Sequence, residues 1–460
     1  MESQIARILF AGTNSGCGKT TVTCAVLQAL VNRGLKVGAF KCGPDYIDPM
    51  FHSRIIGAKS ANLDSWFFDD NTLRFLLAQN GTGRDISIVE GVMGFYDGMG
   101  LTETRGSTYS VARITQTPVV LVVGAKGASL SVLATIQGFL DFCPENQIQG
   151  VILNQCTAST YKALAEEIRC RFAGRVLPLG FLPRLPECSL ESRHLGLVTA
   201  GEVANLQDKL RILAAQAEQT IDLDGLMELS KSAPDICCTP VELPRFEKVR
   251  IAVAKDRAFC FYYEDSLEAL ARMGAELVPF SPLTDAALPE EIHGLYLGGG
   301  YPELYARQLS ENEPMRLSIK NALTKGLPCI AECGGFMYLT EAIGDFPMVG
   351  YLPGKSFDNG KLTRFGYVRL QAKNDQMLCK AGEEIRGHEF HHWDCTEPGG
   401  GFTAVKELSG KRWGCVVSTP TLYAGYPHFH FYANPSFAVN FYRACLEEKN
   451  HAGTYRPHGY

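Results

Sequence analysis

The stretch 10–21, FAGTNSGCGKTT, leaves few folds open to this chain, because it lies between a short apolar run and a segment with helical character. A strand, a glycine-rich turn ending in Gly-Lys-Thr and a helix form a P-loop, whose backbone N–H groups cradle phosphates. The common spacing G-x-x-x-x-G-K-S/T would put glycine where Thr13 stands, so the match is degenerate. The flanking strand and helix favour a nucleotide site over a structural turn.

The loop also predicts roles for individual residues. Lys19 is expected to reach the β- and γ-phosphates, and the hydroxyl of Thr20 is expected to hold Mg²⁺. The residues of this segment predicted to bind the nucleotide are Thr13, Gly16, Gly18, Lys19, Thr20 and Thr21.

Composition narrows the class of protein. At 460 residues the chain is too long for one ordinary core, so two or three domains are expected. A content of 46% hydrophobic and 20% charged residues is typical of a globular protein, and a net charge of −5 argues against nucleic acid as a main partner. The sequence has no run of 18 apolar residues, so we expect neither a membrane span nor a signal peptide. The 16 cysteines include no C-x-x-C pair, which favours reduced thiols in a cytoplasmic enzyme.

The N-terminal half alternates continuous apolar runs with helical patterns. Runs of Val, Ile and Leu without alternation indicate strands buried on both faces, as in a parallel sheet with helices on each side. Strands are predicted at 5–10, 36–41, 85–90, 119–123, 150–154 and 176–182, and helices at 21–33, 130–142 and 161–172. The fold is therefore assigned to the α/β class, with ligand-binding residues at the carboxyl ends of the strands.

Charged residues follow two of these strands. Lys41, Asp45 and Asp48 come after the second strand, where carboxylates suit Mg²⁺ and a lysine can neutralise a transferring phosphoryl group. Glu90 ends the third strand, in the position of a Walker-B-type acid. The alternative for the first group is a plain turn, because Gly-Pro-Asp and Asp-Pro are common turn formers. Their place beside the P-loop favours a site.

Two further polar residues leave alternatives open. Asp97 lies in a glycine-rich loop, where it fits a turn as well as a site. Asn154 ends the fifth strand, where it can hydrogen-bond a base edge or cap the following loop.

The same segments carry a resemblance to a known family. KCGPDYIDP at 41–49, VEGVMGFYDG at 89–98 and HLGLVTAGE at 194–202, behind the GTNSGCGKTT loop, resemble the cobyrinic acid a,c-diamide synthase family. The resemblance spans essentially the whole chain, and the N-terminal domain is similar to dethiobiotin synthetase. It implies a ligase that uses ATP and Mg²⁺ to activate a tetrapyrrole side-chain carboxylate as an acyl phosphate, which ammonia then attacks.

The resemblance also implies roles for residues and partners. Lys19 and Lys41 are implied to bind phosphate. The implied Mg²⁺ ligands are Thr20, Asp48 and Glu90, and the residues implied to face the substrate acid or the metal are Asp45, Tyr46 and Asp97. The expected partners are cobyrinic acid, L-glutamine and ATP, and a homodimer is the assembly to test.

A connector is predicted at 223–248, because this stretch contains prolines and lacks a helical period. It separates a P-loop domain at 1–222 from a second α/β domain at 249–460. Strands of the second domain are predicted at 249–254, 277–280, 294–297 and 329–331, and helices at 263–273 and 314–325.

A reactive cysteine is predicted in the second domain. Cys333 follows the last of these strands in AECGGF, a strand-to-helix turn that exposes the sulfur as in a nucleophile elbow. A glycine run follows another strand, so the N–H groups of Gly299 and Gly300, with that of Gly334, are candidates for an oxyanion hole.

The candidate bases are His428 and His430, which lie on one face of a strand-like segment. This half resembles the class I, triad-type glutamine amidotransferase domain of the cobyrinate and cobyric acid synthases. The resemblance implies that Cys333 attacks the glutamine carboxamide to form a thioester, with His428 as the base. The wider class has G-x-C-x-G and a glutamate two residues after its histidine, where this chain has Ala331 and His430. The third triad member and the choice between the two histidines therefore stay open.

The segment GHEFH at 387–391 resembles another part of the family, which implies that His388 lies near the tetrapyrrole.

The hypothesis that results from these resemblances together is ATP-dependent, glutamine-hydrolysing amidation of carboxylates a and c of cobyrinic acid in cobalamin biosynthesis. The first alternative is the same chemistry on nickel-sirohydrochlorin. The second is a P-loop partitioning or switch ATPase that amidates nothing.

Overall fold

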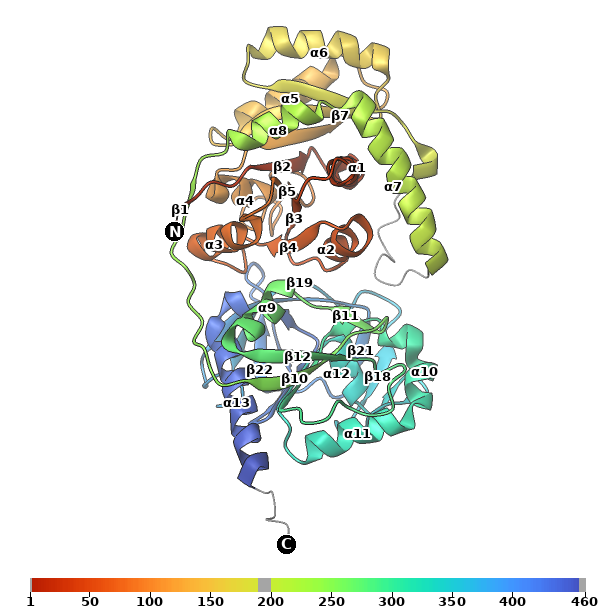
Figure 1. Cartoon of the computed structure of the whole chain (residues 1–460), viewed down its shortest axis with the longest axis vertical. Coiled ribbons are helices and arrows are strands. Elements are labelled where there is room, and N and C mark those ends of the chain that lie inside the picture. The colour runs from red at the N-terminus through yellow and green to blue at the C-terminus, as the bar shows by residue number, and fades with distance from the viewer. Residues whose placement is uncertain (1, 189–199, 455–460) are drawn as a thin grey trace. The chain divides into compact units, whose positions relative to one another are not determined.

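The chain divides into two compact units, Met1–Val241 and Glu242–Tyr460. The computed structural model describes residues 2–188 and 200–454 (Figure 1), so residues 194–199 of the HLGLVTAGE segment lie outside the described part. Within that part, no helix combines the length and the apolar character needed to cross a membrane. In the first unit, β1 (Glu2–Ser3) pairs with β9 (Ile236–Cys237), which ties the start of the chain to the end of the unit.

The first unit is built on a seven-stranded sheet whose pairings are parallel. In spatial order its strands are β4 (Lys59–Leu63), β3 (Val37–Cys42), β5 (Ile86–Glu90), β2 (Arg7–Gly12), β6 (Val119–Gly124), β7 (Ile148–Asn154) and β8 (Leu177–Leu182). Because β2 is central, the P-loop leaves the middle of the sheet's carboxyl edge, and the segments after β3, β5 and β7 leave the same edge.

Helices cover both faces of this sheet. The helical segments are α1 (Lys19–Asn32), α2 (Ile47–Phe51), η1 (His52–Ile56), α3 (Asp70–Gly81), α4 (Thr108–Thr115), α5 (Ser131–Phe142), α6 (Ala158–Phe172), η2 (Pro186–Cys188), α7 (Ala200–Thr220) and α8 (Leu223–Lys231). Residues of α1, α7 and α8 share one core with Ile8 and Phe10 of β2, and Leu9 between them is equally buried. Figure 1 shows α3 and α4 on the opposite side of the strands from α1 and α7. The predicted fold class is confirmed.

Residues 223–231, which we assigned to a connector, instead form α8. The side chain of Asp222 caps this helix by accepting a hydrogen bond from the N–H of Gly225. Leu223, Leu226 and Leu229 are buried in the core of the first unit. The prolines that argued for a connector follow this helix, so the break in the pattern comes later in the chain.

The second unit contains a six-stranded, mostly parallel sheet. Its spatial order is β12 (Ala275–Phe280), β10 (Val249–Ala254), β13 (Gly294–Leu297), β15 (Cys329–Glu332), β25 (Leu422–Gly425) and β24 (Val417–Thr419), of which β24 pairs antiparallel. Its helices include α9 (Glu264–Met273), α10 (Ala306–Glu311), α11 (Glu313–Thr324), α12 (Gly334–Leu339) and α13 (Pro435–Thr454). The strands predicted at 249–254 and 294–297 have these bounds.

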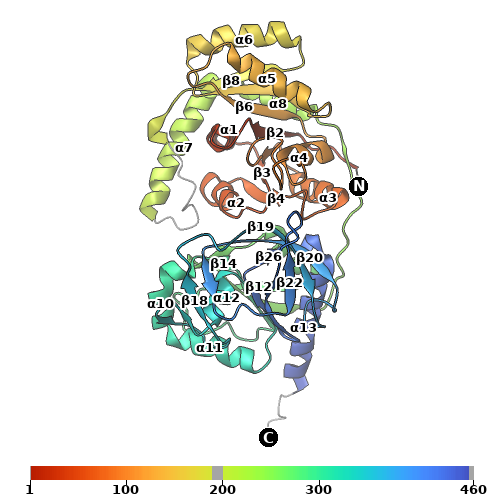
Figure 2. The ribbon, with the colours of Figure 1, turned by 180° about the vertical axis from the view of Figure 1, so that it is seen from behind.

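A five-stranded antiparallel sheet of the second unit was not predicted (Figure 2). Its order is β23 (Arg412–Cys415), β22 (Phe402–Val405), β19 (Arg364–Ala372), β20 (Glu384–His391) and β26 (His428–Phe429). The pairing of β20 with β26 sets His388 opposite His428.

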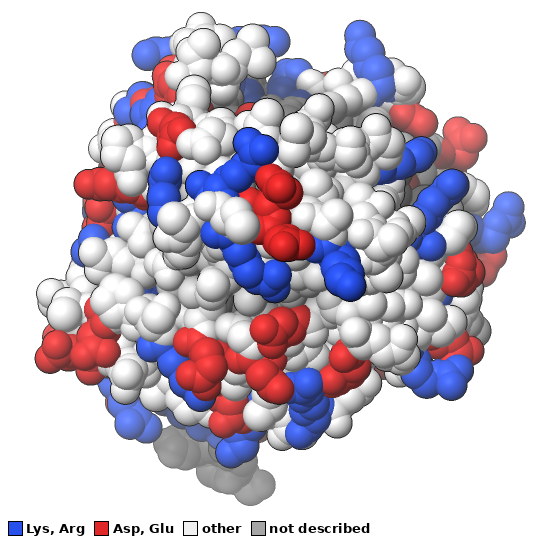
Figure 3. All heavy atoms as spheres, turned by 90° about the horizontal axis from the view of Figure 1, so that it is seen from above, with Lys and Arg blue, Asp and Glu red and all other residues white. Residues whose placement is uncertain are grey.

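On the face seen in Figure 3, acidic and basic side chains are interspersed.

Candidate functional site

The P-loop of the first unit follows β2 and ends where α1 begins at Lys19. Gly18 stands at the helix N-cap with a φ of 91°, a left-handed conformation that suits glycine. A Cβ on Gly18 would lie 1.8 Å from Nδ2 of Asn154. This Nδ2 donates to the carbonyl of Cys17 at 2.8 Å. Asn154 therefore braces the loop.

The other predicted nucleotide residues lie in or next to this loop. Gly16 is exposed with a φ of 82°, and Thr13 is partly buried at the start of the loop. Thr20 and Thr21 follow Lys19 in the first turn of α1. The structure therefore gathers the predicted set at the N-terminus of one helix, the arrangement that favours phosphate.

Polar side chains from three elements converge on Glu90, the last residue of β5. Oγ1 of Thr20 donates to Oε1 of Glu90 at 2.7 Å, and Nζ of Lys41 donates to the same oxygen at 3.0 Å. The Nζ of Lys41 also lies 2.5 Å from Oδ2 of Asp48. Lys41 ends up between two carboxylates because β3 and β5 are neighbours and α2 follows β3.

Burial is the largest influence on the charges of this cluster. It lowers the pKa of Lys19, and the charge of Lys41 lowers it further. Burial also acts to lower the pKa of Lys41, but Asp48 and Glu90 outweigh it and hold that pKa well above its usual value. For Glu90, burial acts upward, yet Lys41 and His52 prevail and the net pKa is lowered. Lys41 and Glu90 therefore face each other as an ion pair at neutral pH.

His52 belongs to the cluster and was not predicted. It is the first residue of η1, its ring is 1% exposed, and its Nε2 lies 3.1 Å from Oε2 of Glu90. Nothing in the segment FHSRII marks this histidine, because η1 is one turn of π-helix without a regular apolar period.

Asp45 and Tyr46 shape the turn before α2. The carboxylate of Asp45 accepts the N–H groups of Ile47 at 3.1 Å and Asp48 at 3.2 Å. Burial, aided by the charge of Asp48, raises the pKa of Asp45 to about 6. Tyr46 is buried at the N-cap of α2. Both residues therefore lie beside the cluster around Glu90, as a turn that holds Asp48.

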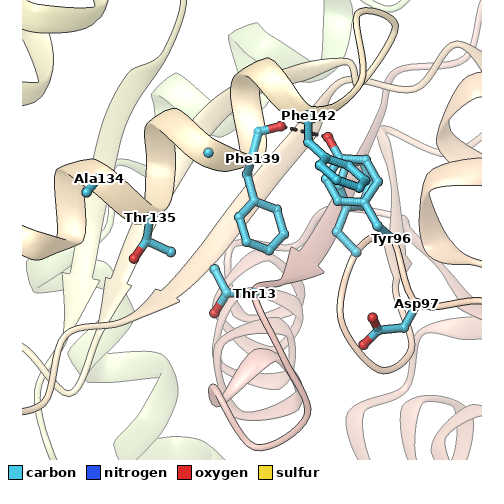
Figure 4. Close-up of a pocket in the computed structure, with 9 residues that line it drawn as sticks. Thr13, Tyr96, Asp97, Ala134, Thr135, Phe139 and Phe142 are labelled. Atoms are coloured by element: carbon cyan, nitrogen blue, oxygen red, sulfur yellow. Dashed lines mark hydrogen bonds between the residues drawn. The ribbon is translucent and has the colours of Figure 1, made fainter. Parts of the chain in front are cut away.

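A pocket of about 430 Å³ lies beside the P-loop (Figure 4). Its wall is aromatic: the ring of Tyr96 stacks on Phe139 with centroids 5.5 Å apart and meets Phe142 at 4.9 Å. The hydroxyl of Tyr96 donates to the carbonyl of Phe139 at 2.6 Å. Thr13 and Asp97 provide polar groups, and Asp97 accepts a backbone N–H of its own loop. The pocket is thus apolar on one side and polar towards the P-loop.

The donor set around Glu90 suits a metal that arrives with a nucleotide. In the part of the chain that the structure describes, no three or more His, Cys, Asp or Glu side chains are arranged to hold a metal ion. Mg²⁺ in phosphate sites takes one or two protein carboxylates and completes its shell with waters and phosphate oxygens. The hydroxyl of Thr20 against Glu90, with Asp48 nearby, supplies such a partial set.

Cys333 in the second unit lies at a strained turn between β15 and α12. Its φ of 48° and ψ of −102° are unusual for a residue with a side chain. Its N–H donates to the carbonyl of Gly425 in β25 at 2.7 Å, which holds the turn against the neighbouring strand. A strained strand-to-helix turn that presents a thiol has the geometry of a nucleophile elbow.

The three glycines predicted for an oxyanion hole surround this turn. The Cβ position of Gly334 lies 3.1 Å from the nitrogen of Gly300. The Cβ position of Gly299 lies 2.6 Å from Cε1 of His428. The backbone of β14 (Gly299–Gly300) therefore lies close to both the elbow and the histidine, and at Gly299 a side chain would collide with His428.

His428 joins the elbow to a buried carboxylate. Its Nδ1 lies 2.9 Å from Oε2 of Glu332, and the two residues are 3% and 1% exposed. Burial acts to lower the pKa of His428, but hydrogen bonds with Cys333 and Glu332 outweigh it and raise the pKa to about 10. Glu332 was not predicted, because it lies within an apolar strand where its spacing carries no signal.

Two other histidines lie beside His428. Nδ1 of His430 accepts the N–H of Tyr432 at 3.1 Å, and burial lowers the pKa of His430 to about 3. The ring of His388 stacks on that of His428 with centroids 5.2 Å apart, and burial lowers its pKa well below the usual range. Of the two candidate bases, His428 is the one hydrogen-bonded to Cys333.

Family profiles match both units. Residues 8–198 match the CobQ/CobB/MinD/ParA nucleotide binding domain, and residues 250–436 match the CobB/CobQ-like glutamine amidotransferase domain. Fold and sites together define a nucleotide-binding unit joined in one chain to a glutamine amidotransferase unit.

Full-length relatives narrow this class. The chain is 41% identical over 454 residues to the cobyrinate a,c-diamide synthase of Listeria innocua, with 95% of this chain and 99% of the relative covered. It is 40% identical to the enzyme of that name from Thermoplasma volcanium over 453 residues, covering 96% and 98%. The chain belongs to the cobyrinate a,c-diamide synthase family. Among solved structures, PurLQS from Thermotoga maritima aligns with 43% of this chain and 98% of its own, at 18% identity and a TM-score of 0.32.

Proposed function

We propose that the protein amidates the a and c side-chain carboxylates of cobyrinic acid, using ATP and the amide nitrogen of glutamine. One observation carries this proposal: a single chain combines a P-loop cluster around Glu90 with a thiol elbow at Cys333 hydrogen-bonded to His428. Identities of 40–41% with cobyrinate a,c-diamide synthases over almost the whole chain support the choice of substrate.

The first unit is assigned the activation step. Oxide is a poor leaving group, so the γ-phosphoryl group of ATP is transferred to a carboxylate oxygen, which releases ADP and gives an acyl phosphate. Ammonia then attacks the acyl carbon, and inorganic phosphate leaves as the amide forms. Lys19 and Lys41 bind phosphate oxygens during this transfer. Thr20, Asp48 and Glu90 would hold Mg²⁺, which neutralises phosphate charge when it is bound.

The aromatic pocket is assigned to the macrocycle. Support comes from its position: Thr13 links it to the P-loop, while Tyr96, Phe139 and Phe142 offer a wall for a flat apolar ring. Asp97 already accepts a backbone hydrogen bond, so its part is to fix the loop that faces the substrate acid.

The second unit is assigned the release of ammonia. Sγ of Cys333 attacks the carboxamide carbon of glutamine, and the oxyanion is met by N–H groups of Gly299, Gly300 and Gly334. The imidazole of His428 takes the proton of the Cys333 thiol and passes it to the departing amide nitrogen, so that ammonia leaves as the thioester forms. It then takes a proton from the water that hydrolyses the thioester and returns it to the sulfur as glutamate leaves. His430 is assigned a structural part, because its Nδ1 accepts a backbone N–H.

The test is diamide formation from cobyrinic acid and ATP, measured by mass spectrometry with either glutamine or ammonium as nitrogen source. Wild type is compared with Cys333→Ala and with Cys329→Ala, a buried free cysteine at the other end of β15. Cys333→Ala is expected to lose the glutamine reaction and keep the ammonium reaction, whereas Cys329→Ala keeps both. Failure of wild type with either nitrogen source contradicts cobyrinic acid as the substrate, and nickel-sirohydrochlorin is then assayed.

A further inference from the structure

The imidazole of His428 needs a fixed orientation, because only one of its nitrogens can face Cys333. Its other nitrogen, Nδ1, lies 2.9 Å from Oε2 of Glu332. Glu332 is adjacent to Cys333 in the sequence, so the elbow turn carries both the thiol and the carboxylate that meets the histidine. The residue two positions after His428 is His430, which has no carboxylate to offer and accepts the N–H of Tyr432.

We propose that Glu332 is the positioning residue of the thiol site, which accepts Nδ1–H of His428 and directs Nε2 at Cys333. This inference rests on the glutaminase half of the proposed function. Glu332 touches neither glutamine nor the reacting carbon; it acts through His428. The arrangement keeps one tautomer of the imidazole and stabilises the imidazolium that forms when the thiol gives up its proton.

The carboxylate is itself held in place. The hydroxyl of Tyr296, from the neighbouring strand β13, donates to Oε1 of Glu332 at 3.2 Å. Oε1 therefore contacts tyrosine and Oε2 contacts histidine, which fixes the plane of the carboxylate. Backbone pairing of Glu332 with Gly425 fixes its main chain. Two hydrogen-bonded oxygens on a strand of a parallel sheet form a rigid support for His428.

Burial gives this contact its strength. Glu332 is 1% exposed and His428 is 3% exposed, so neither side chain meets bulk water. Burial raises the pKa of Glu332, and the hydrogen bonds from His428 and Tyr296 oppose that rise. A buried carboxylate without the histidine would be costly, and a buried imidazolium without the carboxylate equally so. Cys333, Glu332 and the stacked ring of His388 are titratable groups that contact His428, and Glu389 and His391 interact electrostatically with it.

The test compares Glu332→Gln with Tyr296→Phe. Glu332→Gln keeps the shape but replaces the charge, and it is expected to lower glutamine-dependent kcat by roughly 10²-fold or more, as for loss of a proton-transfer partner. Its ammonium-dependent amidation is expected to stay unchanged, and the pH at which iodoacetamide alkylates Cys333 half-maximally is expected to rise. Tyr296→Phe keeps the carboxylate on His428, so its loss of glutamine-dependent kcat is expected to be much smaller. Wild-type glutamine kinetics and an unshifted alkylation profile in Glu332→Gln would overturn the proposal.

A measurement on wild type decides the matter even if the variants fail to fold. In protein labelled with ¹⁵N-histidine, the proposal requires Nδ1 of His428 to carry a proton throughout the pH range of activity, with the resonance assigned by its loss in His428→Gln. An Nδ1 that is unprotonated within that range refutes the proposal. Absence of glutamate release in wild type would count against the proposed function, whereas the tautomer reports on Glu332 alone.

Discussion

At the residue scale, two features of Gly18 leave no place for a side chain. Its backbone is left-handed, and the side chain of Asn154 occupies the position that a Cβ would take. In Gly18→Ala the new Cβ displaces the Asn154 side chain, so its hydrogen bond to Cys17 is lost. We expect a loss of unfolding free energy of about 2–4 kcal/mol, the sum of backbone strain and a broken buried hydrogen bond. Thermal unfolding measures the loss of stability, and calorimetry measures the effect on ATP binding.

The matched control is Gly16→Ala in the same loop. Gly16 has a φ of 82°, close to that of Gly18, but a Cβ there meets nothing within 4 Å. Gly16→Ala is expected to lower the unfolding free energy by the backbone strain alone, about 1–2 kcal/mol. Equal losses in the two variants would show that Asn154 does not brace the loop.

The buried carboxyl of Glu389 on β20 is expected to make the unfolding free energy depend on pH. It is 2% exposed, and burial raises its pKa to about 7 against the opposing influence of Arg364 and a hydrogen bond from Trp413. Between pH 4.5, its unfolded value, and pH 7 the folded protein holds the extra proton, so unfolding free energy falls as pH rises through this window. Glu389→Gln is expected to remove this fall, on the order of 3 kcal/mol, in urea unfolding followed by tryptophan fluorescence.

The control for this pH dependence is Glu447→Gln on α13, where the side chain is exposed. It is expected to leave the slope between pH 4.5 and pH 7 as in wild type. If Glu389→Gln keeps the same slope as well, Glu389 is ionised in the folded protein and the prediction is wrong.

Functional residues at the ends of strands could be predicted from the sequence. Residues whose role depends on a contact with a partner far away in the sequence could not. Lys41 and Glu90 could be predicted because the ends of parallel strands converge on one edge. Glu332 could not, since its partner His428 is 96 positions away and nothing local marks the pair. His52 was missed for the same reason, because its contact with Glu90 joins η1 to the end of a strand that comes much later in the sequence.

At the scale of elements, buried strands could be predicted better than exposed ones. The apolar runs gave β10 and β13 with their observed bounds, because strands buried on both faces carry continuous hydrophobic residues. β19 has an alternating burial pattern and polar residues on one side, so its sequence lacks that signal. Its register is set by pairing with β20 and β22 across long loops. α8 was missed because prolines follow it closely.

Helix α5 allows a prediction about the aromatic pocket. Phe142 ends this helix, is 70% exposed and meets the ring of Tyr96. If the pocket holds the macrocycle, Phe142→Ala is expected to raise the KM for cobyrinic acid about tenfold, the equivalent of roughly 1.4 kcal/mol of lost contact. The KM values for ATP and glutamine are expected to stay unchanged. Steady-state kinetics with each substrate varied in turn provide the measurement.

Phe365→Ala provides the comparison for the pocket variant. Phe365 lies on β19 in the second unit, is 65% exposed and contacts another phenylalanine, Phe390. Its removal is expected to leave the KM for cobyrinic acid unchanged. Equal KM values in wild type and Phe142→Ala would exclude the aromatic wall as a contact for the macrocycle.

At the scale of the whole molecule, the chemistry is divided between two cores. Thr20, Lys41 and Glu90 belong to the unit Met1–Val241, and Cys333 and His428 belong to Glu242–Tyr460. The contacts described above for each cluster come from residues of its own unit: Cys333 follows β15 of the six-stranded sheet, and His428 lies on β26 of the five-stranded sheet. A substitution in one cluster should therefore leave the other intact.

Lys19→Met tests this division. Lys19 is expected to contact phosphate. Among the described residues its Nζ donates only a long hydrogen bond of 3.4 Å, to the carbonyl of Met93, so its removal should spare the fold. We expect amidation to fall by about 10²-fold or more with glutamine and with ammonium alike, because phosphate charge goes uncompensated in the transition state. Alkylation of Cys333 by iodoacetamide is expected to proceed as in wild type.

Lys162→Met on the exposed side of α6 serves as the control and should change neither reaction. A Lys19→Met protein that amidates normally with ammonium would contradict a phosphate-binding role for this residue, and one whose Cys333 no longer reacts would contradict the independence of the two clusters.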